Sequence, residues 1–197
     1  MDERFEEAVR NKSHLFIKNF VDKNDIPTDW SEYINFFHHQ YQQRDPIDWE
    51  THKEEFMKGG RVRRGFVQIW GYATMFIENP NKNFFPKLPN IWDKAEESFG
   101  RTIRNGFAII NLSSSENITN KHNDVTHNLY VQTIGSVVWK VYDYFNNDET
   151  YSEYHLEPGD AVWVPANVMH EVIAEVPRSA ITVQFAAEEH ELFRNIR

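Results

Sequence analysis

The amino-acid sequence predicts a mainly β protein with helices in its N-terminal part. From Gly106 onwards, short runs of strand-forming residues alternate with turn-forming residues, whereas the earlier apolar and aromatic residues include helical spacings. The 197 residues suit one domain, and they contain no internal repeat or long linker. We therefore expect a single domain over 1–197. In it, 1–105 is mostly helical with one or two bracing strands, 106–186 is the β core, and 187–197 is a tail helix.

Before Gly106, the expected elements are helices with short strands between them. Asp29 or Ser31 can cap a helix, because both side chains accept hydrogen bonds from the first helical N–H groups. The aromatic face of this helix runs through Tyr33, Phe36, Phe37 and Tyr41. The other elements are, in order, a strand or approach segment over Leu15–Val21, a polar helix over 50–58, one or two strands over Arg64–Phe76, a loop bracketed by Pro86 and Pro89, and a helix over Ile91–Phe99 ending at Gly100.

After Gly106, strand signals recur at short intervals. Ile134–Ser136 and Asn146–Asp148 have the composition of hairpin turns, and Glu188–Ile196 is expected to form the tail helix. The seven expected strands are Phe107–Leu112, His122–Thr133, Val137–Tyr144, Tyr151–Leu156, Ala161–Pro165, His170–Val176 and Ser179–Phe185.

Composition and charge exclude several classes of function. Fifteen Phe, eight Tyr and six Trp argue against disorder, and the absence of Cys excludes disulfides, zinc ribbons and thiol catalysis. The charged start and the lack of a long apolar run predict a soluble, cytoplasmic protein with no membrane partner. The net charge of −9 argues against nonspecific duplex binding, so there is no strong nucleic-acid signal. Lys58–Arg64 is a local exception, either a solvated turn or a patch for an acidic substrate or nucleic acid.

His122, Asp124 and His170 are the candidate metal ligands and catalytic centre. Two imidazoles and one carboxylate form the donor set of a facial triad, which holds Fe(II) on one face and leaves other positions open. Residues i and i+2 of a β-strand point to the same side, so His122 and Asp124 can reach one metal, and His170 completes the site from a distant strand. For the His122–Asp124 pair alone, an exposed polar strand edge is the alternative.

Two stretches carry a family resemblance. HNDVTHNLYVQTIG begins at His122, and Gly159–His170 has the spacing G-x5-P-x-N-x2-H. They resemble the two motifs of the cupin superfamily, whose fold is a double-stranded β-helix, although Asp124 and Asn128 replace the usual His and Glu. With the rest of 106–186, they are most similar to the JmjC-like hydroxylases. The resemblance implies Fe(II), 2-oxoglutarate as co-substrate, and O₂.

The same resemblance implies four contacts to 2-oxoglutarate. Asn128 and Gln184 would provide amides near its metal-chelating end, and Thr119 a hydroxyl at its far carboxylate. The asparaginyl-hydroxylase branch of the JmjC-like hydroxylases also has a Lys where this chain has Val137. Lys140 has the wrong strand parity to replace that Lys. Arg178 is the expected substitute, since a buried dianion requires a cation or several hydrogen-bond donors. The alternatives are barrel-lining amides, a loop threonine and a surface arginine.

The resemblance implies an oxygenase that hydroxylates a C–H bond, with a protein or peptide side chain as the favoured substrate. A small-molecule or nucleobase substrate is the alternative. Two other functions are considered: a metal-dependent cupin isomerase or dioxygenase that does not use 2-oxoglutarate, and a non-catalytic cupin-like binding protein. His127 is expected to be structural, because its odd position turns it away from the ligand pair.

Overall fold

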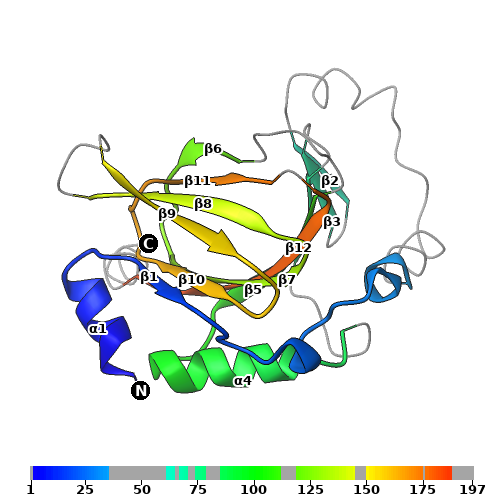
Figure 1. Ribbon diagram of the computed structural model, residues 1–197, viewed down its shortest axis with the longest axis horizontal. Helices are drawn as coiled ribbons and strands as arrows, with labels where there is room; N and C mark the ends of the chain where they lie inside the picture. The colour runs from blue at the N-terminus through cyan, green and yellow to red at the C-terminus, as the bar shows by residue number, and fades with distance from the viewer. Residues whose placement is uncertain are drawn as a thin grey trace, which may run out of the picture.

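The computed structural model describes residues 2–35, 61–64, 67–70, 74–78, 85–111, 119–144, 150–174 and 176–187. They form two antiparallel sheets that face each other (Figure 1). The strands of the larger sheet, in spatial order, are β1 (Leu15–Ile17), β10 (Ala161–Val164), β7 (His127–Ile134), β12 (Arg178–Phe185), β5 (Asn105–Asn111), β4 (Thr74–Glu78), β3 (Val67–Trp70) and β2 (Arg61–Arg64). Those of the smaller sheet are β6 (Thr119–His122), β11 (His170–Ile173), β8 (Val137–Tyr142) and β9 (Tyr151–Leu156).

From β5 to β12 the chain passes repeatedly from one sheet to the other. β5, β7, β10 and β12 lie in the larger sheet, and β6, β8, β9 and β11 lie in the smaller one. Strands distant in the sequence are therefore paired, such as β12 with both β5 and β7. This winding is that of a double-stranded β-helix, and the predicted fold class is confirmed.

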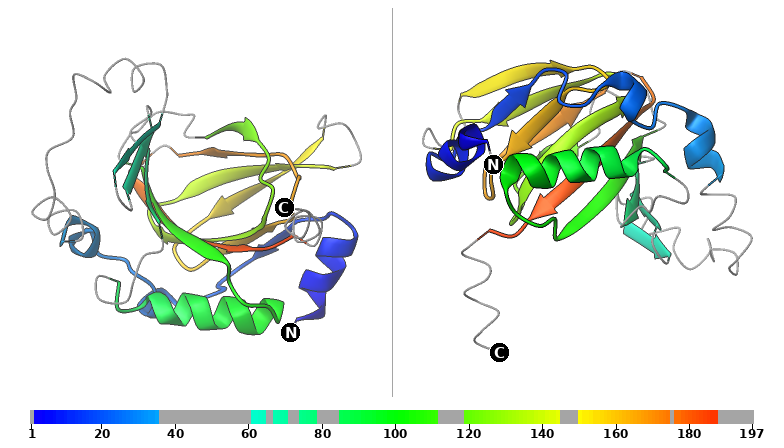
Figure 2. Two further views of the ribbon diagram at one scale, coloured as in Figure 1. Left: turned by 180° about the vertical axis from the view of Figure 1, so that it is seen from behind. Right: turned by 90° about the horizontal axis from the view of Figure 1, so that it is seen from below.

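Helices cover the outer side of the larger sheet (Figure 2). In α1 (Glu3–Arg10), the Asp2 side chain caps the first turn by accepting from the Arg4 N–H. α4 (Leu88–Phe99) ends at Gly100 with a φ of 68°, the left-handed conformation that glycine adopts without strain. Their apolar sides join outward-facing strand residues in one buried core. Among its members are Phe5, Ile91, Phe99, Trp163 and Ile181.

A second buried core lies between the sheets. Ile109 and Tyr130 of the larger sheet meet Val137, Trp139 and Val172 of the smaller one. Along β8, buried and half-buried residues alternate, as expected for a strand with one side toward an interior. The interior is thus lined by alternate residues of each barrel strand.

Several predicted elements differ from the structure. The α4 helix begins at Leu88, so Pro89 lies in its first turn rather than at the end of a loop, which suits a residue without an N–H. The expected strand over His122–Thr133 is two strands, because 123–126 form a turn between β6 and β7. α1 and the short 3-10 helix η1 (Lys23–Asp25) were not predicted.

The N-terminal part contributes more to the sheet than expected. It supplies β1 and the three strands β2, β3 and β4, where the sequence predicted one or two strands over Arg64–Phe76. Asp29 caps the helical segment that starts at Trp30 by accepting from the Ser31 N–H. Predictions for 36–60, Asn146–Asp148 and Glu188–Ile196 lie outside the described residues, as do the side chains of Arg61–Arg64.

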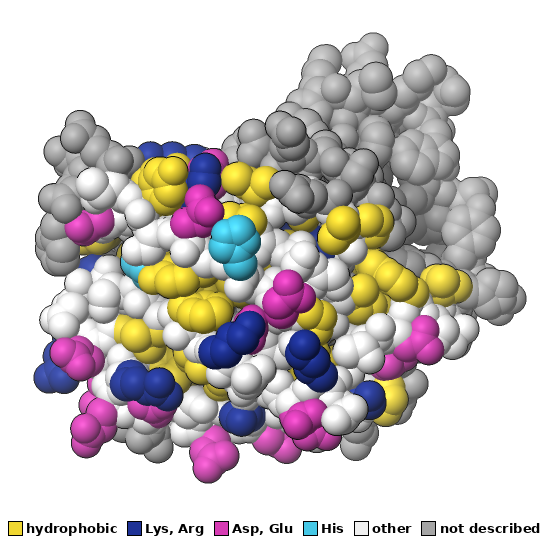
Figure 3. All heavy atoms as spheres, viewed as in Figure 1, with side chains coloured by type: hydrophobic (Ala, Val, Ile, Leu, Met, Phe, Trp, Pro, Cys, Tyr) yellow, Lys and Arg dark blue, Asp and Glu magenta, His cyan; other side chains and the backbone are white. Residues whose placement is uncertain are grey.

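On the face seen in Figure 3, Lys and Arg side chains are interspersed with Asp and Glu rather than gathered in one patch. Hydrophobic side chains lie between them. Within the described parts of the chain, no helix combines the length and the apolar character needed to cross a membrane.

Candidate metal centre

Two histidines lie side by side in the smaller sheet. β6 ends at His122, β11 begins at His170, and the two residues are cross-strand partners. Their ring centroids are 4.3 Å apart, with the ring planes at 55°. Strand register therefore brings together two imidazoles that are distant in the sequence.

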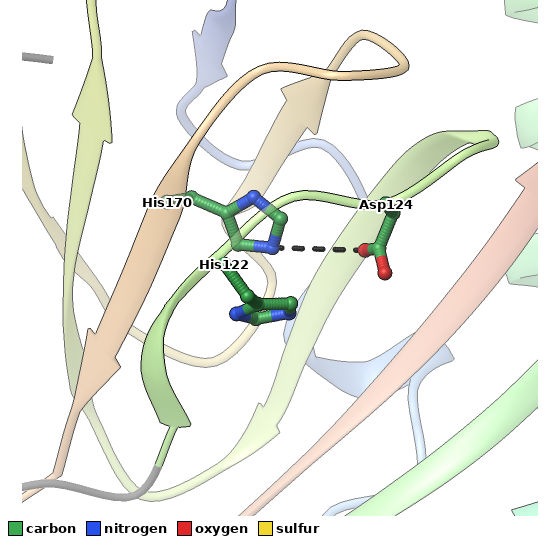
Figure 4. A group of neighbouring side chains, drawn as sticks. All are labelled: His122, Asp124 and His170. Atoms are coloured by element: carbon green, nitrogen blue, oxygen red, sulfur yellow. Dashed lines mark ion pairs between the residues drawn. The ribbon is translucent and has the colours of Figure 1, made fainter.

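Asp124 reaches the same place from the turn after β6. The local sequence argument, which placed His122 and Asp124 on one strand, is wrong because β6 ends at His122. The turn is instead held by a residue distant in the sequence, because the Asp124 carbonyl accepts a hydrogen bond from the Asn167 N–H at 2.7 Å. One ligand atom from each of His122, Asp124 and His170 lies within 4.8 Å of the other two (Figure 4). The three side chains are therefore close enough to share one metal ion.

His170 presents one ring nitrogen to this centre. The side chain is buried, and Nδ1 lies 3.0 Å from the Val168 carbonyl oxygen, which can only accept a hydrogen bond. Nδ1 therefore carries the proton, and Nε2 offers a lone pair. Burial, followed by the charge of His122, lowers the pKa of His170 to about 4, although Asp124 acts in the opposite direction. Nε2 is buried without a hydrogen-bond partner, 3.6 Å from Asp124 Oδ2.

The Asp124 carboxylate is held by two donors from β7. Asn128 Nδ2 donates to Asp124 Oδ2 at 2.6 Å, and the Tyr130 hydroxyl donates to the same oxygen at 2.9 Å. The Asn128 amide is itself oriented, because its Oδ1 accepts from the Thr126 hydroxyl at 3.0 Å. Burial, and then the charge of Asp124, raise the pKa of Tyr130 well above its usual value, so the phenol remains a donor.

Arg178 is a buried cation at the start of β12. Its side chain is 2% exposed, and its Nε has no hydrogen-bond partner. Two residues further along β12, Ala180 pairs with Ile109, a residue of the interior core, so strand parity places Arg178 on the interior side. Burial lowers the pKa of Arg178 to about 10, opposed by the nearby Tyr130 hydroxyl. The guanidinium stays charged at neutral pH, and no carboxylate of the described residues forms an ion pair with it.

Gln184 and Thr119, the other two predicted contacts, are located by their strand pairing. Gln184 is the cross-strand partner of Asn128, and it lies on the same side of β12 as Arg178 by strand parity. The backbone of Thr119 pairs with Val172 in the smaller sheet, and its side chain is outside the described set.

Lys140 and His127, the two residues set aside by strand parity, lie as expected. Lys140 is half-buried on the outer side of β8, where it is 3.7 Å from the Glu171 carboxylate. His127 is buried in the outer core, where it stacks on Trp163 and accepts from the Ala166 N–H. Val137 is buried in the interior core, so the cation of the JmjC-like pattern is absent at this position.

Sequence reasoning missed one interior hydroxyl. Thr182 Oγ1 is buried and has no hydrogen-bond partner. Thr182 lies on the same side of β12 as Arg178 and Gln184. The alternation of side chains along this strand could therefore have identified it from the sequence. The hydrogen bond from the Tyr130 hydroxyl to Asp124 was not predicted either.

The fold and the three converging side chains define a double-stranded β-helix with a facial set of metal-type ligands. No protein-family model matches this chain. No curated protein sequence matches it either.

Solved structures resemble it in fold. The Escherichia coli ribosomal oxygenase YcfD superposes with a TM-score of 0.60 at 14% identity, over 98% of this chain and 55% of that one. The structure of YcfD in complex with cobalt and 2-oxoglutarate superposes with a TM-score of 0.50 at 18% identity, over 67% of this chain and 36% of that one. The non-heme α-ketoglutarate-dependent epimerase SnoN from nogalamycin biosynthesis gives 0.52 at 13% identity, over 92% and 81% of the two chains. This chain thus spans about half the length of YcfD or less.

Proposed function

We propose that this protein is an Fe(II)- and 2-oxoglutarate-dependent oxygenase that hydroxylates a C–H bond. The observation that carries the proposal is the convergence of His122, Asp124 and His170 within 4.8 Å in a double-stranded β-helix. Two neutral nitrogens and one carboxylate are the donors of non-heme Fe(II) oxygenases. The described ligand atoms fit such an ion, since His170 Nε2 is buried, without a partner, and directed at Asp124.

When bound, the iron together with 2-oxoglutarate and O₂ supplies the oxidising power for the reaction, and the protein supplies binding and orientation. His122, Asp124 and His170 would hold the metal. Trp139 stacks on the His170 ring at 5.4 Å and 23°, which limits its rotation. The interior core that surrounds these side chains excludes water from one side of the site.

Arg178 is proposed to bind the far carboxylate of 2-oxoglutarate. A buried guanidinium that finds no anionic partner among the described residues is costly, and a dicarboxylate would supply that partner. Its planar donors can grip a carboxylate bidentately. Thr119, Asn128 and Gln184 are proposed as further contacts, of which Gln184 and Asn128 are adjacent across β12 and β7.

A protein or peptide side chain is the proposed substrate. Support comes from the likeness to a ribosomal oxygenase over nearly the whole of this chain. SnoN, with a similar fold, is an epimerase that depends on the same co-substrate, so the outcome of the reaction needs its own test. Incubation with ribosomal proteins, Fe(II) and 2-oxoglutarate should add one oxygen atom to a side chain, detectable by mass spectrometry.

Anaerobic titration tests the metal centre. The purified chain should bind one Fe(II), and Asp124→Ala should abolish this binding or nearly so, because it removes the only anionic ligand of the set. Asp93→Ala, a matched change at an exposed position of α4, should bind Fe(II) as the wild type does. Full iron occupancy in Asp124→Ala would remove the basis of the proposal.

Addition of 2-oxoglutarate to the Fe(II) form tests the co-substrate. A metal-to-ligand charge-transfer band should appear without oxygen, and slow conversion to succinate should follow when oxygen is admitted. Iron binding with no band and no detectable 2-oxoglutarate binding would favour the metal-dependent isomerase or dioxygenase. A chain that binds neither would favour the non-catalytic binding protein.

A further inference from the structure

The carboxylate of Asp124 has two unequal oxygens. Oδ2 accepts from both Asn128 Nδ2 and the Tyr130 hydroxyl, at 2.6 and 2.9 Å. Oδ2 is also the carboxylate oxygen that lies 3.6 Å from His170 Nε2. The other oxygen, Oδ1, accepts no hydrogen bond from the side chains of the described residues.

We propose that Tyr130 is a positioning residue that, together with Asn128, fixes the Asp124 carboxylate in the orientation in which it would bind the metal. This inference rests on the proposed function. Both donors hold Oδ2 from β7, so the plane of the carboxylate is set relative to the two imidazoles.

The surroundings of Tyr130 support a positioning role. The side chain is 7% exposed, and its ring packs 4.4 Å from Trp139 and 6.1 Å from His170. These contacts fix the ring, so the hydroxyl has little freedom to turn away. Asn128 is completely buried and is oriented by Thr126, which directs its NH₂ group toward Asp124. The carboxylate is therefore held by a network that is itself rigid.

Tyr130→Phe isolates the hydroxyl, because the ring and its packing remain. We expect Fe(II) and Co(II) affinity to fall about 10-fold or more, the usual effect of removing a partner of a metal ligand. The visible absorption spectrum of the Co(II) form should also change, because a carboxylate that has lost one of its two donors is free to turn and alter the coordination of the metal. A purely structural role of the phenol would lower the melting temperature and leave this spectrum as it was.

Tyr154→Phe is the matched control, since its hydroxyl is bonded to His14 Nε2 at 2.9 Å, away from the ligands. It should bind Co(II) with the affinity and spectrum of the wild type. If Tyr130→Phe does not fold, Thr126→Val provides the second test, because it releases the Asn128 amide without a change in the core. It should weaken Co(II) binding to a smaller extent and alter the spectrum in the same direction.

A Tyr130→Phe protein, or in its place Thr126→Val, with unchanged affinity and an unchanged Co(II) spectrum would overturn this inference alone. A wild-type chain that binds neither Fe(II) nor Co(II) would overturn the proposed function, and this inference with it. The two failures are thus distinguishable in one set of titrations.

Discussion

Replacement of Arg178 by Met should stabilise the protein without its co-substrate and weaken the binding of 2-oxoglutarate. Met keeps a long, flexible, apolar side chain, so most of the packing around the stem is retained. What is removed is a guanidinium that is 2% exposed and has an Nε without a partner. The two expected effects have opposite signs, which separates a binding role from a structural one.

The effect on stability follows from the cost of burying the charge. Burial lowers the pKa of Arg178 from 12.5 to about 10, and each pKa unit corresponds to about 1.4 kcal/mol. The charged form is thus disfavoured in the folded state by about 3 kcal/mol at neutral pH. Removal of the charge recovers part of this, so the free energy of unfolding of the metal-free variant should equal or exceed that of the wild type.

The effect on binding comes from the loss of the pair that 2-oxoglutarate would complete. When one partner of a buried ion pair is removed, the remaining charge is left uncompensated, at a cost of about 3–5 kcal/mol. That cost corresponds to a loss of affinity of roughly 100-fold or more. Fe(II) binding should be unaffected, because Arg178 is not among the three candidate ligands.

Denaturant unfolding without metal and anaerobic titration with 2-oxoglutarate measure the two effects. Arg104→Met, at an exposed position just before β5, should change neither. Unchanged 2-oxoglutarate affinity in Arg178→Met would show that the carboxylate is held elsewhere. Weaker affinity together with a large loss of stability would show that Arg178 supports the fold rather than the ligand.

Three further predictions concern stability. Because the folded-state pKa of His170 lies near 4, below its unfolded value, the metal-free protein should lose up to about 3 kcal/mol of unfolding free energy as the pH falls from 6.5 to 4, and His170→Gln should lose less over that interval in chemical denaturation. Gly135→Ala should cost at least about 1 kcal/mol in the same assay, because φ is +68° and its Cβ would lie 2.5 Å from the Pro177 carbonyl oxygen. Gly106→Ala should cost about 1–3 kcal/mol, because its Cβ would overlap the Trp92 ring; an unchanged melting temperature would contradict either glycine prediction.

The β core could be predicted because its strands are short, apolar and separated by turn residues. The predicted strand over Tyr151–Leu156 matches β9, and that over Ser179–Phe185 lies within β12, which begins one residue earlier. The strands before Gly106 were underestimated, because β2 to β4 are stabilised by pairing to one another and to β5. Such pairing is a long-range effect that a local pattern does not reveal.

The candidate ligands could be predicted, although the local reason was wrong. His122 and Asp124 converge through a turn fixed by the Asn167 N–H, and not through strand alternation. The Tyr130 bond to Asp124 could not be predicted from the sequence, because its geometry depends on how that turn brings the carboxylate over β7. Motif spacing thus identifies which side chains meet, while their hydrogen bonds depend on the loop between them.

The position of Arg178 also gives a physical reason why Val137 is tolerated in the interior. A Cβ at Gly135 would lie 3.3 Å from Arg178 Cβ, so the β7–β8 turn and the start of β12 are in contact. Val137 follows two residues later, at the start of β8 and on the interior side. A cation at 137 and a cation at 178 would therefore enter the interior from the same end of the barrel. Two buried cations there would repel each other, so the neutral Val137 avoids a repulsion with Arg178.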